Sequence, residues 1–258
     1  MAQAATAIAN KPVWVDLASS DPAKSRDFYT KVFGWQVEVS DDPQYGGYGL
    51  AKVDGKDAAG IGGKMSPDMA DAWTLYIGTA DAEETARKVE AAGGKVVAPP
   101  FAVGDQGRMA VFQDSAGAYI AVWETSAMGG FQAEGSNTYG WAELNARGVQ
   151  NALPFYRKVF GWTAKSSEMG EGQPPYNEFQ LDGESIAGAW EMNADVPTAM
   201  PSYWMVYFGV DDVDAAYRKA LDAGAREMLP PQDFPGGRFA IVNDPLGAMF
   251  GILRMSGR

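Results

Sequence analysis

The chain of 258 residues contains neither cysteine nor histidine. Without cysteine there are no disulfides, no thiolate catalysis and no zinc–sulfur sites, and we expect a cytoplasmic location. Without histidine the chain lacks the most common general base and metal ligand. Any catalysis must therefore rest on carboxylates, hydroxyls, amines or backbone groups, and any metal site would need oxygen ligands.

Basic residues are also scarce, with 21 Lys and Arg against 33 Asp and Glu and a net charge of −12. Such an acidic surface repels phosphate backbones and anionic lipids, so we expect neither nucleic acid nor a membrane as a partner. No apolar run approaches the roughly 20 residues that span a bilayer. The start, MAQAATAIANKP, has no basic segment and only a weak apolar stretch, so it predicts a flexible arm over 1–12 and not a signal peptide.

What the sequence does contain is a long internal repeat. The motif RDFYTKVFGW (26–35) returns as LPFYRKVFGW (153–162), and Trp14 and Asp16 upstream match Trp141 and Glu143. Two further matches pair DAWTLYIGTAD (71–81) with PSYWMVYFGVDD (201–212), and GRMAVFQDSAGAYIAVWE (107–124) with GRFAIVNDPLGAMFGILR (237–254). The repeat predicts two domains, 13–126 and 139–256, joined by a Gly/Ser-rich linker over 127–138.

Each domain contains the same order of elements twice. In the first domain WVDLAS (14–19) alternates as a strand, and Asp21-Pro22 begins a helix that Gly34 ends. Three strand-like runs follow, and the order then recurs with Asp81 and Glu84 forming a capping box. The predicted class is α+β, with two tandem domains, each built from two βαβββ units that curl into a half-open barrel around a cleft.

The order of elements, the FYxKVFGW helix end, the WTLYIGTAD step and the QDSAGAYIAVWE hairpin resemble the vicinal oxygen chelate superfamily. This superfamily includes glyoxalase I, extradiol dioxygenases, fosfomycin-modifying enzymes and bleomycin-binding proteins. The tandem arrangement is most similar to two-domain glyoxalase-like proteins of actinobacteria. The resemblance covers residues 13–254 and implies two glyoxalase-like domains, a fold that serves several chemistries and also pure binders.

The resemblance also implies where metal ligands would lie, on the first, fifth and last strand of each domain. These positions hold Trp14, Thr74 and Ala121 in the first domain, and Trp141, Met205 and Gly251 in the second. The usual ligands in the family are His, Gln or Glu. Because these side chains are poor ligands for a divalent metal, we expect no metal and no other cofactor in either cleft.

Aromatic and apolar side chains would fill each cleft instead, beside one acid on its first strand. Trp and Tyr offer broad apolar area with a polar tip, which suits planar ligands. Desolvation would make the acid a stronger base. The expected ligand contacts are Trp14, Thr74, Tyr119, Trp123, Trp141, Met205 and Met249. The expected catalytic groups are Asp16 and Glu143 as bases, with Tyr76 and Tyr207 as hydrogen-bond donors to an oxyanion.

Structural roles compete with these assignments. Trp14 and Trp141 plug the clefts in one interpretation and stack on a ligand in the other. The two first-strand acids could bind backbone groups or pair with Arg108 and Arg238, which is the commoner fate of a buried acid.

Three further features have structural explanations. The aromatic residues of the FYxKVFGW motif are expected in the core. Asp114 and Asp244 precede glycine-containing hairpins, and turn chemistry accounts for them. The glycine cluster AAGIGGK (58–64) lies in a strand context, so it is not a phosphate-binding loop.

Three classes of function remain open. The first is metal-independent binding of a small hydrophobic or aromatic molecule, of the sequestration or resistance type. The second is a cofactor-free isomerase, cyclase or lyase that uses a cleft carboxylate as base, and the third is a metal-dependent glyoxalase- or hydroxylase-like enzyme. Since the clefts differ, for example at Thr74 and Met205, one can be functional while the other is structural. We expect a small-molecule partner and a monomer or homodimer.

Overall fold

The computed structural model describes residues 9–170, 172–194 and 196–256. In the first domain the order of one strand, one helix and three strands occurs twice, as predicted. The first round comprises β1 (Pro12–Ser19), α2 (Pro22–Phe33), β2 (Gln36–Val39), β3 (Gly49–Val53) and β4 (Lys56–Gly63), with a short 3-10 helix, η1 (Pro43–Tyr45). The second comprises β5 (Ala72–Thr79), α3 (Ala82–Ala91), β6 (Lys95–Val103), β7 (Gly107–Gln113) and β8 (Tyr119–Thr125).

The second domain repeats this order. Its first round comprises β9 (Thr138–Ala146), α4 (Val149–Phe160), β10 (Thr163–Ser167), β11 (Tyr176–Leu181) and β12 (Glu184–Glu191). Its second comprises β13 (Tyr203–Gly209), α5 (Val213–Asp222), β14 (Arg226–Phe234), β15 (Gly237–Asn243) and β16 (Met249–Met255).

The predicted arm over 1–12 falls largely outside the described residues, which begin at Ala9. Ala9 forms an isolated parallel bridge with Gly78, and Pro12 already belongs to β1. Within the described part of the chain, no helix is both long enough and apolar enough to cross a membrane.

Each domain contains an eight-stranded mixed sheet. In the first domain four strands follow the order β2-β3-β4-β1 and four the order β5-β8-β7-β6. The second domain repeats both orders, as β10-β11-β12-β9 and β13-β16-β15-β14. β1 runs parallel to β4 and β5 parallel to β8, while the hairpins between them are antiparallel. The predicted α+β class, with two tandem domains each built from two βαβββ units, is confirmed.

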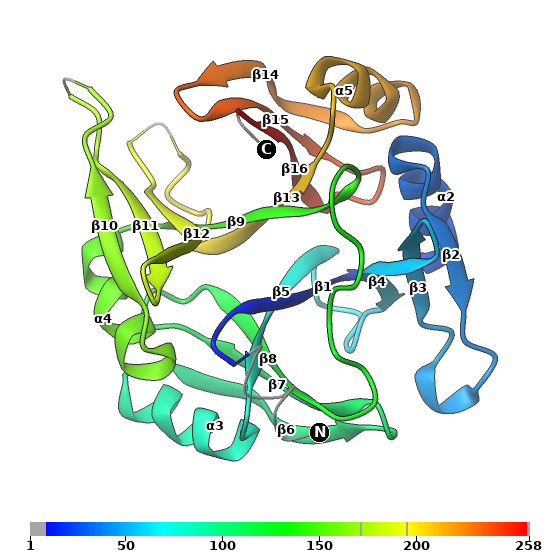
Figure 1. Ribbon diagram of the computed structural model, residues 1–258, viewed down its shortest axis with the longest axis horizontal. Coiled ribbons are helices and arrows are strands. Elements are labelled where there is room, and N and C mark those ends of the chain that lie inside the picture. The colour runs from blue at the N-terminus through cyan, green and yellow to red at the C-terminus, as the bar shows by residue number, and fades with distance from the viewer. Residues whose placement is uncertain (1–8, 171, 195, 257–258) are drawn as a thin grey trace. The chain divides into compact units, whose positions relative to one another are not determined.

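The chain forms two compact units, and each unit contains segments from both domains. One unit combines 75–129 with 142–204, and the other combines 14–74 and 130–141 with the chain from 205 onward. In the latter, α2 and α5 lie side by side, and in the former α3 and α4 do (Figure 1). We call them the α2–α5 unit and the α3–α4 unit. Each unit therefore joins one βαβββ round from each domain.

Local sequence signals set the helix ends. The Asp21 side chain accepts a hydrogen bond from the Lys24 N–H at the start of α2, and Gly34 ends the helix in the left-handed conformation at φ 72°. At α3, Asp81 accepts from the Glu84 N–H as predicted. The Asp81 N–H donates to Thr79 Oγ1, so this half of the expected capping box is met by a different side chain.

The FYxKVFGW motif anchors a residue of the other domain. Tyr29, on α2, is fully buried and donates from its hydroxyl to Asp244 Oδ2 at 3.2 Å, while the indole of Trp73 donates to the same hydroxyl at 2.9 Å. The α3–α4 unit repeats this arrangement. Tyr156 donates to Asp114 Oδ2 and accepts from the indole of Trp204 at 2.9 Å.

Turn chemistry therefore explains only one of the two carboxylate oxygens of each hairpin aspartate. Asp114 Oδ1 accepts from the backbone of Ala116 and Ala118, as the sequence predicts for a hairpin turn. Its second oxygen accepts from the tyrosine of the other domain. We call Tyr29–Asp244 and Tyr156–Asp114 the phenol–aspartate pairs. Each pair joins the two βαβββ rounds of a single unit. The repeated motif therefore helps to hold each unit together.

Candidate functional site

The first-strand residues Trp14 and Asp16 lie on the same face of β1 and share one hydrogen-bonding partner. The Trp14 side chain is 4% exposed, and its indole N–H donates to the hydroxyl of Tyr48 at 3.0 Å. The Tyr48 hydroxyl in turn donates to Asp16 Oδ2 at 3.4 Å, a long hydrogen bond. Trp14 and Asp16 thus lie beside each other, and Tyr48 joins them as a residue that sequence reasoning missed.

Glycines on β4 make room for the Tyr48 ring. A Cβ atom on Gly60 would lie 1.7 Å from the Tyr48 hydroxyl, and one on Gly62 would lie 2.9 Å from its Cδ2. Gly60 pairs directly with Asp16 in the parallel β1–β4 ladder. The AAGIGGK cluster is therefore the sequence signal that could have identified this site, because glycines in a strand often mark a close approach.

Burial and the charge of Asp16 together raise the pKa of Tyr48 well above its usual value. The phenol therefore stays protonated at any physiological pH. It acts as a hydrogen-bond donor toward Asp16 and as an acceptor from Trp14. The cluster combines one carboxylate, one neutral phenol and one indole.

Aromatic side chains continue from Trp14 into the linker. The Phe131 ring lies 5.7 Å from the Trp14 ring, and the Tyr139 ring stacks on Phe131 at 4.8 Å with an interplanar angle of 19°. We call Trp14, Phe131 and Tyr139 the aromatic row. The linker is held in place by the backbone N–H groups of Gln132 and Ala133, both of which donate to the Asp57 carbonyl. Phe131 was missed because it was assigned to a connecting segment.

The hydroxyl of Tyr139 is buried and has no hydrogen-bond partner among the described residues. Leaving such a group unpaired costs about 1–3 kcal/mol, so an orphan hydroxyl calls for an explanation. Burial alone raises the pKa of Tyr139 far above the usual range, so the hydroxyl keeps its proton. The row thus ends in a neutral donor that no described protein group accepts from.

The second domain has a different environment around its first-strand acid. The amide of Asn145 approaches Glu143 Oε1 at 3.3 Å. Burial, and then the charge of Glu143, raise the pKa of Tyr203 to about 12. On the neighbouring strands the rings of Tyr176 and Trp190 lie 6.2 Å apart. In the α3–α4 unit the acid therefore has an amide and a phenol beside it.

The two predicted oxyanion donors are buried tyrosines that lie against small residues. Tyr76 is 5% exposed and pairs with Ala121 across β5 and β8. Tyr207 is 6% exposed and pairs with Gly251, where a Cβ atom would come within 1.9 Å of its ring. Each tyrosine is thus positioned tightly by a parallel ladder, and its catalytic role stays a prediction.

The remaining predicted contacts range from open to buried. Tyr119 is 53% exposed at the start of β8, whereas Met205 is buried. Trp123 is buried and its indole donates to the Met128 carbonyl at 2.9 Å, a contact that favours a structural role. The half-buried side chains among them are Thr74, Trp141 and Met249.

The alternative in which two arginines pair with the first-strand acids is not supported. Arg108 forms ion pairs with Glu83 and Glu124. Arg238 forms ion pairs with Asp214 and Asp233. All of these pairs are partly exposed, so they are surface contacts of modest energy.

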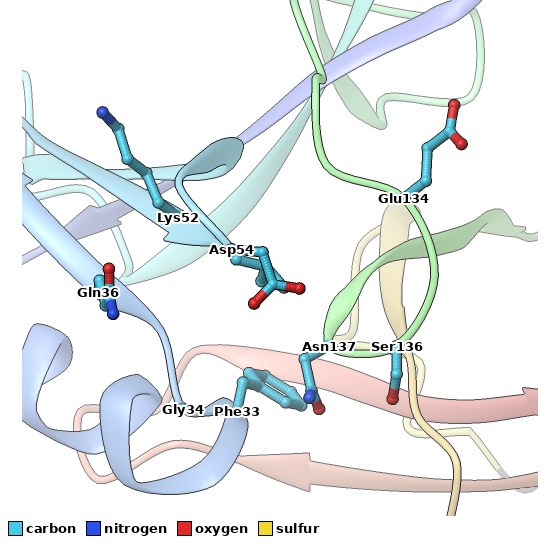
Figure 2. Close-up of a pocket in the computed structure, with 9 residues that line it drawn as sticks. Phe33, Gly34, Gln36, Lys52, Asp54, Glu134, Ser136 and Asn137 are labelled. Atoms are coloured by element: carbon cyan, nitrogen blue, oxygen red, sulfur yellow. The ribbon is translucent and has the colours of Figure 1, made fainter.

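A cavity of about 440 Å³ lies elsewhere in the α2–α5 unit, between the end of α2, the β3–β4 turn and the linker (Figure 2). The Asp54 carboxylate points into it, whereas the side chains of Lys52 and Glu134 point away (Figure 2). The Lys52 ammonium is already paired with Glu38. The walls of this cavity are largely polar. Small-molecule sites, in contrast, are mostly apolar with a few convergent polar groups. The Trp14 cluster fits that description better and is the candidate site.

The family's metal ligands do not fit the residues at the corresponding positions. The indole N–H of Trp14 is a donor, already bonded to Tyr48, and Ala121 and Gly251 carry no ligating atom. Among the described residues, no three Asp or Glu side chains gather closely enough to hold a metal ion. The side chains at these positions thus differ from the His, Gln or Glu ligands that are usual in the family.

Comparisons with known proteins agree with this fold. The chain belongs to the Glyoxalase/Bleomycin resistance protein/Dioxygenase superfamily, whose family model matches residues 11–122 and 138–252. It is 36% identical over 250 residues to "Putative glyoxylase CFP32" of Mycobacterium tuberculosis, with 94% of each chain covered. It is also 36% identical over 260 residues to the anthracycline biosynthesis protein DnrV of Streptomyces peucetius, with 95% of this chain and 93% of the relative covered.

Solved structures show the same fold at low identity. The Mn(II)-bound glyoxalase from Novosphingobium aromaticivorans is 17% identical, with a TM-score of 0.66 over 95% of this chain and 82% of that one. The 2,3-dioxygenase LapB from Pseudomonas sp. KL28 is 12% identical, with a TM-score of 0.63 over 95% and 91%. Identities this low carry the fold and not the chemistry.

Proposed function

We propose that this protein binds a small planar aromatic molecule without a metal ion, at the aromatic row and the Trp14–Tyr48–Asp16 cluster. The row carries the proposal, because Phe131 and Tyr139 are half-buried and present ring area beside polar groups. Stacking on aromatic side chains supplies area and geometry to such ligands. A hydroxyl and a carboxylate next to the rings would fix the orientation of the ligand.

Two observations support this choice over a metal enzyme. The residues at the family's ligand positions lack the donors that divalent metals prefer. One relative is named for anthracycline biosynthesis, and anthracyclines are planar polycyclic aromatic compounds. The other relative is named a glyoxylase, so the test must also examine metals.

The first experiment combines metal analysis with a binding measurement. Mass spectrometry of the purified protein is expected to find no stoichiometric metal, and Mn²⁺, Ni²⁺, Zn²⁺ and Fe²⁺ are expected to leave the melting temperature unchanged. The planar probe 2-(hydroxymethyl)anthracene is expected to quench tryptophan fluorescence and to raise the melting temperature, because a ligand that binds only the folded state stabilises it.

A matched pair of variants tests the location. Phe131→Ala removes one ring of the row and is expected to weaken probe binding about tenfold, the order of one lost aromatic stack. Gln132→Ala changes an exposed neighbour and keeps its backbone hydrogen bond, so binding should be unchanged. Absence of binding to the wild-type protein, or one metal per chain with a raised melting temperature, would overturn the proposal.

A second candidate function follows from the hydrogen bond between Tyr48 and Asp16. In a cofactor-free isomerase, Asp16 would take a proton from a carbon of the bound molecule and return it to another carbon. The neutral Tyr48 hydroxyl would donate a hydrogen bond to the oxyanion formed in between. Tyr48 would thus take the role of hydrogen-bond donor that was predicted for Tyr76.

Asp16→Asn separates this function from binding alone. If the protein is an enzyme, the variant should bind the same molecules while turnover falls by a factor of about 100 or more, the usual contribution of a general base. Equal turnover by Asp16→Asn and the wild-type protein, on any substrate that is converted, would rule out Asp16 as the base.

A further inference from the structure

The buried hydroxyl at the end of the aromatic row indicates what kind of planar molecule the site accepts. We infer that Tyr139 donates a hydrogen bond to a ring carbonyl of the ligand, so the site selects carbonyl-bearing polycyclic aromatics such as quinones over plain arenes. The inference rests on the proposed function, because it concerns the same aromatic row.

The geometry sets Tyr139 apart from the other buried tyrosines of the aromatic clusters. Tyr29, Tyr48 and Tyr156 each donate to an aspartate and accept from an indole. The Tyr139 hydroxyl is buried too, and it has no partner in the part of the chain that the structure describes. Its ring is held by the stack on Phe131, so the hydroxyl has a fixed position.

The chemistry of this group favours an acceptor on the ligand. Burial makes ionisation of the phenol unfavourable, so Tyr139 offers a proton and carries no charge. A site built to hydrogen-bond one ligand atom discriminates against the analogue that lacks it, because the site group is then left unpaired. A ring carbonyl is such an acceptor, and it is carried by a planar ring system of the kind that stacks on aromatic side chains.

Two probes that share a frame test the inference. 2-(Hydroxymethyl)anthraquinone and 2-(hydroxymethyl)anthracene have the same ring outline, no charge and the same side group, and only the former carries ring carbonyls. Their Kd values for the full-length wild-type protein and for Tyr139→Phe are measured by tryptophan fluorescence and checked by calorimetry. Tyr45→Phe, a half-buried tyrosine outside the row, is the control.

We expect the wild-type protein to bind the quinone about 5- to 20-fold more tightly than the arene. In Tyr139→Phe this preference should disappear, with arene binding unchanged, and Tyr45→Phe should behave as the wild-type protein does. Equal binding of both probes by the wild-type protein, or a preference that persists in Tyr139→Phe, would overturn the inference and leave the proposed function standing. If neither probe binds, the proposed function itself fails. Unchanged arene binding also shows that Tyr139→Phe is folded.

Discussion

The β1–β4 round and the β9–β12 round are copies of one unit, and they differ at several positions, one of which is the position of Gly62. In the former, Gly60 and Gly62 leave space for Tyr48 to lie against β4 and reach Asp16 and Trp14. In the latter, the position of Gly62 is taken by Trp190, whose ring lies 6.2 Å from Tyr176. A large side chain at that position fills the space that a glycine leaves open. The two copies therefore place different side chains around equivalent positions, with glycine beside Tyr48 in one and Trp190 beside Tyr176 in the other.

The phenol–aspartate pairs show the opposite behaviour. Tyr29 with Asp244, and Tyr156 with Asp114, make the same contacts in both units, and each tyrosine accepts from one indole. The residues of the phenol–aspartate pairs are thus kept in both units, whereas the position of Gly62 holds a tryptophan in the other copy.

The largest expected effect tests whether the two phenol–aspartate pairs are equivalent. Tyr29→Phe and Tyr156→Phe each remove a hydroxyl that joins a buried aspartate to a buried indole N–H. Each change should lower the free energy of unfolding by about 2–4 kcal/mol, because two buried groups lose a partner. Urea unfolding of both variants measures it. Tyr119→Phe, at an exposed position, should stay within about 0.5 kcal/mol of the wild-type value.

The outcome that would break the comparison is an unequal one. A small cost for one of the two tyrosines, with a large cost for the other, would mean that one copy assembles without its pair.

A smaller effect is expected at the glycines that distinguish the two copies. Gly60→Ala places a methyl group onto the Tyr48 hydroxyl, so the ring must move and its bond with Trp14 is lost. Overpacking of this kind costs about 1–3 kcal/mol. Gly63→Ala lies on the same strand in open space, so it should change the free energy of unfolding by less than about 0.5 kcal/mol. Equal values for both variants would show that the position of Tyr48 does not depend on the absence of a side chain at residue 60.

Much of the fold could be predicted because its signals are local. The caps Asp21 and Gly34 and the alternation of the strands are read within a few residues. The phenol–aspartate pair of Tyr29 and Asp244 joins residues 215 positions apart, and no local pattern reports it. Of the candidate site, Trp14 was predicted from the ligand positions that the family resemblance implies, and Asp16 from its place on the same strand. Their partners were missed because one depends on a gap left by glycines and the other, Phe131, comes from the linker.

The smallest expected effect concerns pH and the same two aspartates. Burial raises the pKa of Asp114 and of Asp244 above their usual value, although hydrogen bonds to each carboxylate oppose the shift. The folded state then holds the proton more tightly than the unfolded state does. The stabilising contribution of each group is therefore complete below the unfolded pKa, about 3.9, and is lost as the pH rises through the raised folded value.

Asparagine does not titrate, so Asp114→Asn and Asp244→Asn should each lack this loss of stability. The free energy of unfolding of the wild-type protein minus that of either variant is expected to be largest near pH 3. It should shrink as the pH rises and become constant above the folded pKa. Urea unfolding between pH 3 and 7 measures the difference, with the exposed Asp41→Asn as control. A difference that grows with pH would show that hydrogen bonding, and not burial, dominates these carboxylates. A pH dependence in only one of the two variants would mean that the two units differ at their most closely repeated contact.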